Sequence, residues 1–171
     1  MKKLFLIPIA AVALFAFSPT VSDETTGGKK IPSVNIKDMA GNPINTAEVS
    51  NDGNPIVISF WATWCKPCKL ELNTIAEEYD TWQEETGVKL VAVSVDDQKT
   101  TNTVEPVVNA AGWEYDIWMD PNGEFKRALG VNFVPHTFLI DGEGNIVYSH
   151  NNFVPGDEEI LYQHVKEISK K

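Results

Sequence analysis

The sequence is poor in cysteine, with two in 171 residues, which is too few for a disulfide scaffold. The two lie three positions apart, at Cys65 and Cys68, so they suit local chemistry better than the closing of a long loop. Basic residues are also scarce: 14 Lys and Arg stand against 24 Asp and Glu, and the formal net charge is −10. We therefore expect no nucleic acid or anionic membrane surface as a partner, and we interpret the acidic groups as a solvated surface.

No apolar run reaches the length of about 20 residues that a membrane-spanning helix needs. The longest run, Leu4 to Phe17, contains Pro8 and follows the basic residues Lys2 and Lys3. A short basic segment before an apolar one is typical of an export signal. We predict a signal peptide over residues 1–22, with an uncleaved N-terminal anchor as the alternative. The protein is then exported, and we expect it in the periplasm or cell envelope of a bacterium.

The rest of the chain is expected to form one domain. Residues 23–30 hold almost nothing to bury and are interpreted as a linker. Residues 31–171 show no repeats. The chain is 43% apolar, with 11 glycines and 10 prolines, so it can build one sizeable core.

Apolar patterns predict an α/β fold. Continuous apolar runs at 55–62 and 88–95 indicate strands buried on both faces. Between them, apolar side chains recur every three or four residues from 72 to 82, which predicts a helix that ends at Gly87. The remaining expected elements are an N-terminal hairpin over 34–44, a helix from 104 to 111, a strand over 113–119, a short helix over 125–129, a hairpin of 137–140 with 146–148, and a last helix from 157. The order predicts a three-layer sandwich whose mixed sheet has parallel central strands and an antiparallel C-terminal hairpin.

The two cysteines stand where a buried strand meets a helix, in the segment Trp64-Cys65-Lys66-Pro67-Cys68. A helix N-terminus presents unpaired N–H groups and a partial positive charge, which lower the pKa of a C-x-x-C thiol from about 8.5 to about 3.5–7.5. We therefore predict that Cys65 is the nucleophile and that Cys68, one turn inside, is the shielded resolving thiol. Lys66 adds a positive charge to this active-site loop, and Pro67 suits the first turn of the helix.

A C-x-x-C pair also has uses other than redox chemistry. A structural zinc site needs four ligands, and the sequence has no second cysteine pair. Covalent haem attachment needs C-x-x-C-H, but residue 69 is lysine. A copper-binding metallochaperone could combine both thiols with His136, His150 or His164, and a purely structural disulfide also stays open. We expect no metal site, and no cofactor beyond the redox-active disulfide itself.

Two segments resemble a known family. Phe60 to Cys68 is similar to the active-site signature of thioredoxin-fold proteins, and Val134 to Asp141 is similar to their cis-proline strand. Residues 31–171 resemble the exported TlpA/ResA/DsbE-like group of thiol–disulfide oxidoreductases. The separation of Cys68 and Pro135 leaves room for that group's added helix and strand, about 103–119 here.

Three single positions bear on the resemblance. Glu71 stands where the group has a glutamate, three residues after the second cysteine, and Ser59 stands where thioredoxin has a buried aspartate. Asn73 departs from the proline that many members have, so we expect a less kinked helix. From the residues alone, Glu71 is either a partly desolvated acid that exchanges protons with the thiols or an ordinary solvated helix glutamate. The resemblance favours the first.

The resemblance implies roles for the substrate groove. The Val134–Pro135 bond is expected to be cis and to face the dithiol, with the backbone of Val134 free to pair with an extended substrate. Trp64 is expected to border the dithiol and limit access to it, whereas Trp61 is interpreted as core. His136 is interpreted as a strand residue with an ordinary hydrogen bond and not as a catalyst.

We therefore predict a monomeric enzyme that reduces selected protein disulfides through Cys65 and Cys68. The resemblance implies a membrane thiol donor of the DsbD or CcdA kind, and substrates such as apocytochrome c or damaged envelope proteins. The alternatives are a disulfide oxidase or isomerase, a thiol peroxidase and the copper-binding metallochaperone.

Overall fold

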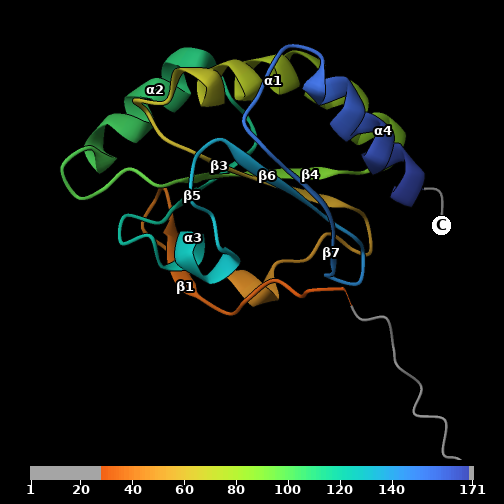
Figure 1. Ribbon diagram of the computed structural model, residues 1–171. Helices are drawn as coiled ribbons and strands as arrows, with labels where there is room; N and C mark the ends of the chain where they lie inside the picture. The colour runs from red at the N-terminus through yellow and green to blue at the C-terminus, as the bar shows by residue number, and fades with distance from the viewer. Residues whose placement is uncertain (1–27, 170–171) are drawn as a thin grey trace, which may run out of the picture.

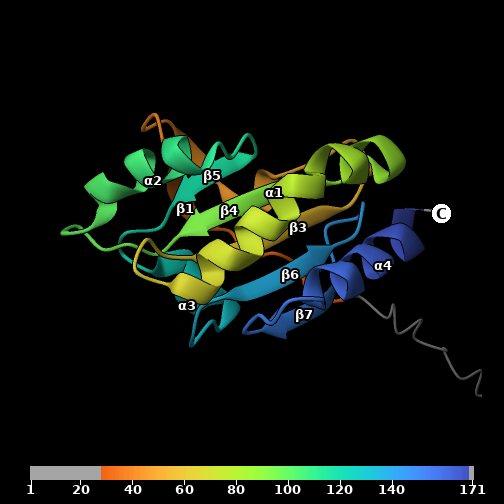
Figure 2. The same cartoon turned by 90° about the horizontal axis from the view of Figure 1, so that it is seen from above.

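The structure is a computed structural model that describes residues 28–169. The predicted signal peptide therefore lies outside the described residues. The described chain forms a seven-stranded sheet with the strand order β2-β1-β5-β4-β3-β6-β7, and helices lie on both of its faces (Figures 1 and 2). This is the predicted three-layer α/β sandwich of thioredoxin-like type.

The sheet is mixed, as predicted. Its parallel centre consists of β3 (Ile56–Trp61), β4 (Lys89–Ser94) and β5 (Asp116–Met119). The antiparallel strands β6 (His136–Ile140) and β7 (Ile146–Asn151) extend it beyond β3. At the other edge, β5 pairs with a hairpin of β1 (Asn35–Asp38) and β2 (Pro43–Asn45).

The helices divide unequally between the two faces. Three of them, α1 (Lys66–Thr86), α2 (Val104–Ala111) and α4 (Asp157–Ser169), cover one face, whereas α3 (Glu124–Leu129) lies on the other (Figure 1). Short 3-10 turns span Thr46–Glu48 and Thr101–Thr103.

The alternation of strand side chains produces two cores. In β3 all six residues are buried. Val57 and Trp61 join the core beneath α1, α2 and α4, whereas Ile58 and Phe60 join the core on the α3 side. Because β3 is covered on both faces, its sequence is a continuous apolar run interrupted only by Ser59, which is also buried.

The inserted α2 and β5 are fastened to α1 by polar contacts. The indole Nε1 of Trp113 donates to Asn73 Oδ1 at 2.8 Å, and the hydroxyl of Tyr115 donates to the carbonyl of Leu72 at 3.2 Å. These contacts turn residues 113–115 toward the helix, so β5 begins at Asp116 and is shorter than predicted. α1 is one continuous 21-residue helix across Asn73.

The end of the predicted linker is paired with the C-terminal hairpin. Lys30 forms an isolated β-bridge with Asn145, and the carbonyl of Lys29 accepts a hydrogen bond from Ile146 N–H at 2.9 Å. Among the helices described here, none is long and apolar enough to cross a membrane.

Candidate active site

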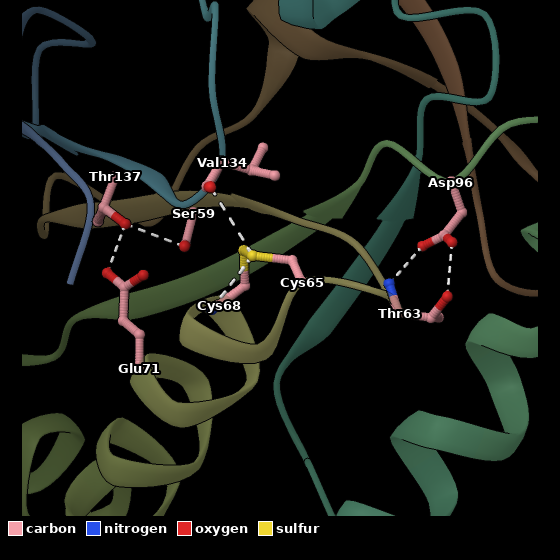
Figure 3. Close-up of a disulfide and its surroundings, with 8 residues drawn as sticks. All are labelled: Ser59, Thr63, Cys65, Cys68, Glu71, Asp96, Val134 and Thr137. Atoms are coloured by element: carbon pink, nitrogen blue, oxygen red, sulfur yellow. Dashed lines mark hydrogen bonds between the residues drawn. A yellow bond between two sulfur atoms is a disulfide. The ribbon is translucent and has the colours of Figure 1, made fainter.

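Cys65 and Cys68 form a disulfide at the N-terminus of α1 (Figure 3). Cys65 is the N-cap residue, and its Sγ accepts a hydrogen bond from the Cys68 N–H at 3.3 Å. Lys66 and Pro67 are the first two residues of the helix, as the sequence predicted. The same N–H group would stabilise a thiolate on Cys65 after reduction.

The two sulfur-bearing residues differ in burial. Cys68 is completely buried, whereas Cys65 retains 5% of its surface. This difference in exposure agrees with the expectation that the first cysteine meets the substrate and the second is shielded.

The predicted groove strand lies beside Cys65. Val134–Pro135 is a cis peptide bond, and the Val134 carbonyl oxygen lies 3.7 Å from Cys65 Sγ (Figure 3). Trp64 is 65% exposed, and Phe133, next to Val134, is 81% exposed. Sequence reasoning missed Phe133, although its place beside Val134 in the apolar run before the proline could have signalled it.

Glu71 is buried in the same region, with 1% of its surface exposed. The interpretation of Glu71 as a solvated helix residue is therefore wrong. Thr137 Oγ1 donates to Glu71 Oε1 at 2.6 Å and also lies 2.9 Å from Ser59 Oγ (Figure 3). Because Thr137 has a single hydroxyl proton, Ser59 donates to Thr137 while Thr137 donates to the carboxylate.

His150 is a second partner of Glu71 that sequence reasoning missed. Its Nε2 lies 3.1 Å from Glu71 Oε1, although the two residues are 79 positions apart. The cause is a register shift in the β6–β7 hairpin between Leu139 and Ile140, beyond which Thr137 pairs with His150. Residues that pair directly share one face of the sheet, so the shift turns His150 toward Glu71.

The loop before Cys65 is held by a buried carboxylate. Asp96, 1% exposed, accepts hydrogen bonds from the Thr63 N–H and hydroxyl (Figure 3). This residue was also missed, because nothing in the sequence between β4 and α2 marks an aspartate as buried.

Burial shifts the titration of two residues near the site. The pKa of His136 is lowered by burial first and by the proximity of His150 second. The pKa of Tyr115 is raised, again chiefly by burial and then by the nearby charge of Glu71. His136 stacks on Phe138 with ring centroids 4.2 Å apart, and neither of its ring nitrogens has a hydrogen-bond partner within residues 28–169. The expectation that His136 makes an ordinary hydrogen bond is therefore wrong for the described residues.

The sequence matches a known protein family. Residues 27–149 match the AhpC/TSA family, which is most of the chain. The chain belongs to this family. ResA, a thiol–disulfide oxidoreductase of Bacillus thuringiensis (strain Al Hakam), is 32% identical over 120 residues, which cover 70% of this chain and 66% of ResA. DsbE, the thiol:disulfide interchange protein of Tatumella citrea, is 32% identical over 170 residues, covering 87% of this chain and 85% of DsbE.

Solved structures agree with the fold. A thioredoxin-like protein from Porphyromonas gingivalis is 44% identical, with a TM-score of 0.74 over 82% of this chain and 92% of that one. StoA from Bacillus subtilis is 25% identical, with a TM-score of 0.62 over 78% of this chain and 97% of StoA. Within the AhpC/TSA family, the protein is thus a thiol–disulfide oxidoreductase of the ResA/DsbE type, with Cys65 and Cys68 as its C-x-x-C pair.

The histidines do not converge on this pair. His150 contacts Glu71, and His164 lies against Glu167 with Nδ1 3.3 Å from the carboxylate. In the described part of the chain, no three His, Cys, Asp or Glu side chains are grouped as a metal ion would require. The alternative of a copper-binding metallochaperone gains no support from this geometry.

Proposed function

We propose that this member of the AhpC/TSA family is exported and reduces selected disulfides of other exported proteins. We propose cytochrome c maturation or envelope disulfide repair as the setting in which it acts. The site requires no bound cofactor, because the electrons are carried by the cysteine pair itself.

The reaction divides between the two cysteines. The Cys65 thiolate attacks one sulfur of the substrate disulfide, forming a mixed disulfide and releasing the other substrate sulfur as a thiolate. Cys68 then loses its proton and attacks Cys65 Sγ. The Cys65–Cys68 disulfide forms, the second substrate sulfur leaves with the electron pair, and both substrate thiolates take up protons. Two electrons pass from the protein to the substrate.

Glu71 is the observation that carries the reducing direction. Its carboxyl group is buried one helical turn after Cys68, and its Oε1 accepts a hydrogen bond from Thr137 Oγ1 at 2.6 Å. A buried negative charge disfavours thiolates near it and so destabilises the reduced form of the pair. A dithiol whose reduced form is destabilised gives up its electrons more readily, whereas strong oxidants such as DsbA stabilise the reduced form.

The surface around Cys65 fits an extended protein segment. The Val134 carbonyl lies beside the nucleophile, and the exposed side chains of Trp64 and Phe133 belong to the residues that precede Cys65 and Val134 in the sequence. Backbone pairing with Val134 would orient the substrate, while the two rings would contact apolar side chains that flank its cysteine.

An exported reductant needs a supply of electrons. The glutathione and thioredoxin pools that keep cytoplasmic thiols reduced do not act on proteins outside the cytoplasm. We propose that a membrane thiol protein of the DsbD or CcdA kind reduces the Cys65–Cys68 disulfide, and that the protein works as a monomer so that one groove serves both donor and substrate.

Trapping tests this function. In a Cys68→Ser variant the mixed disulfide on Cys65 cannot be resolved, so exported substrates should accumulate as adducts that a thiol reductant releases. A Cys65→Ser variant, which lacks the attacking sulfur but keeps Cys68, is the matched control and should trap far less. Equal trapping by the two variants, or none by Cys68→Ser in cells that express it, contradicts the proposal.

A further inference from the structure

On one side, Glu71 faces hydroxyl groups that cannot take up a proton near neutral pH. Thr137 and Ser59 contribute hydroxyls, and Tyr115, whose pKa is raised chiefly by burial, contributes a phenol. None of these hydroxyl groups can take over a proton that Glu71 receives from Cys68.

His150 supplies the group that Glu71 lacks. An imidazole can both take up and release a proton, and His150 Nε2 lies 3.1 Å from Glu71 Oε1. Its side chain is 15% exposed against 1% for Glu71, and β7 is the last strand of the sheet. His150 therefore lies between the buried carboxylate and the surface.

We propose that Glu71 and His150 work as one acid–base unit, in which His150 positions the carboxylate and shares the proton that Cys68 gives up. The proposal rests on the resolving role given to Cys68 above. As Cys68 attacks the mixed disulfide, its S–H bond breaks and the Glu71–His150 unit gains one proton. The S–S bond to Cys65 forms while the substrate sulfur leaves with the electron pair, and solvent later removes the shared proton.

Other titratable side chains surround the unit without joining it. The ring centroid of Tyr148, on the same strand, lies 5.9 Å from that of His150. The ring of His164, on α4, lies against Tyr148 in a tilted arrangement, with centroids 4.2 Å apart. His136 on β6 is close enough for the charge of His150 to lower its pKa, although burial is the larger cause. Of these groups, only Glu71 makes a polar contact with His150 among the described residues. Within the described residues, Glu71 is therefore the side chain with which His150 can exchange a proton.

His150→Gln tests the proposal, because glutamine can donate a hydrogen bond to Glu71 yet cannot share a proton with it near neutral pH. His164→Gln is the matched control, since His164 is a neighbouring histidine on α4 that does not contact Glu71. The reduced chain is mixed with one equivalent of 5,5′-dithiobis(2-nitrobenzoate) in a stopped-flow instrument. The first coloured thiolate released reports attack by Cys65, and the second reports resolution by Cys68.

In His150→Gln the second phase should slow by about tenfold at pH 7, and its pH profile should move to higher pH while the first phase is unchanged. His164→Gln should overlay the parent in both phases. A second phase in His150→Gln with the parent's rate from pH 5 to 9 overturns the proposal. If Cys68→Ser still releases the second thiolate, the roles of the cysteines are wrong, which is a separate failure.

A measurement on the unaltered chain covers the case in which His150→Gln does not fold. The ring signals of His150 are followed by NMR over the same pH range in the dithiol and the disulfide forms. A different titration in the two forms supports the shared proton. Identical titrations, with no response of His150 to Glu71→Gln, overturn it.

Discussion

Asp96 is bonded to Thr63 at two points, although the two residues are 33 positions apart. Asp96 Oδ2 accepts from the Thr63 N–H at 2.8 Å, and Oδ1 accepts from the Thr63 hydroxyl at 2.6 Å. Ser94 also donates to Oδ2, at 2.9 Å. Because Thr63 lies two residues before Cys65, a carboxylate after β4 fixes the loop that carries the nucleophile.

Replacing Asp96 with asparagine should destabilise the oxidised protein. In asparagine, one of the two oxygens that accept hydrogen bonds from Thr63 is replaced by an NH2 group, which cannot accept one. The free energy of unfolding should therefore fall by about 1–3 kcal/mol. Urea unfolding followed by tryptophan fluorescence measures this change. Asp97→Asn is the matched control, because Asp97 is exposed and bonds within its own turn, to Lys99 and Thr100, and it should change stability little. Equal effects of the two substitutions would show that the loop does not depend on Asp96.

The unequal burial of the cysteines predicts unequal alkylation. In the reduced protein, Cys65 at the helix N-cap should react with iodoacetamide within the time in which Cys68 stays largely unmodified. Peptide mapping by mass spectrometry after a brief exposure gives the ratio of the two adducts. Preferential labelling of Cys68 would reverse the roles assigned to the pair.

The charge of Glu71 should set the reduction potential of the pair. Glu71→Gln removes a buried negative charge, so the reduced form gains stability and the potential becomes less negative by about 30 mV or more, a tenfold change in the equilibrium constant. Glu78→Gln makes the same change of charge at an exposed position of α1 and should leave the potential unaltered. If both variants keep the parent's potential, the argument for the reducing direction fails.

His136 should make the protein sensitive to acid. Burial lowers its pKa in the folded state, so below about pH 6.5, where the histidine of the unfolded chain binds a proton, the unfolded state is favoured. The free energy of unfolding should therefore fall between pH 7 and pH 5, and His136→Leu should reduce that fall. His164→Gln, at a half-buried site, should keep that fall. Urea unfolding at a series of pH values measures the parent and both variants. An unchanged acid dependence in His136→Leu would exclude His136 as its source.

Local patterns account for the parts of the fold that carry the cysteines. The run through β3 is apolar because both faces of that strand are covered, and the spacing of apolar residues in α1 follows the helix period. Each depends on neighbours in sequence, so the strand–helix junction at Cys65 could be predicted. Glu71 lies on the same helix, one turn beyond Cys68.

The partners of Glu71 depend on contacts that no local pattern specifies. A regular hairpin counted from the pairing of Ile140 with Ile146 would place Ser149 opposite Thr137. The irregularity adds one residue and turns His150 to that face in its place. Asp96 likewise reaches the loop before Cys65 only because β3 and β4 pair in parallel, which places the ends of both strands side by side. Such residues can be identified only from the register of the paired strands, which local sequence patterns do not specify.

The reduction potential of Cys65–Cys68 tests the account most directly. The protein is equilibrated in glutathione or dithiothreitol buffers of known potential, and the fraction of disulfide is read after acid quenching and alkylation. A reductant of protein disulfides should have a potential near that of thioredoxin, about −270 mV. A value near that of DsbA, about −120 mV, would make the protein an oxidant and contradict both the proposed function and the role given to Glu71.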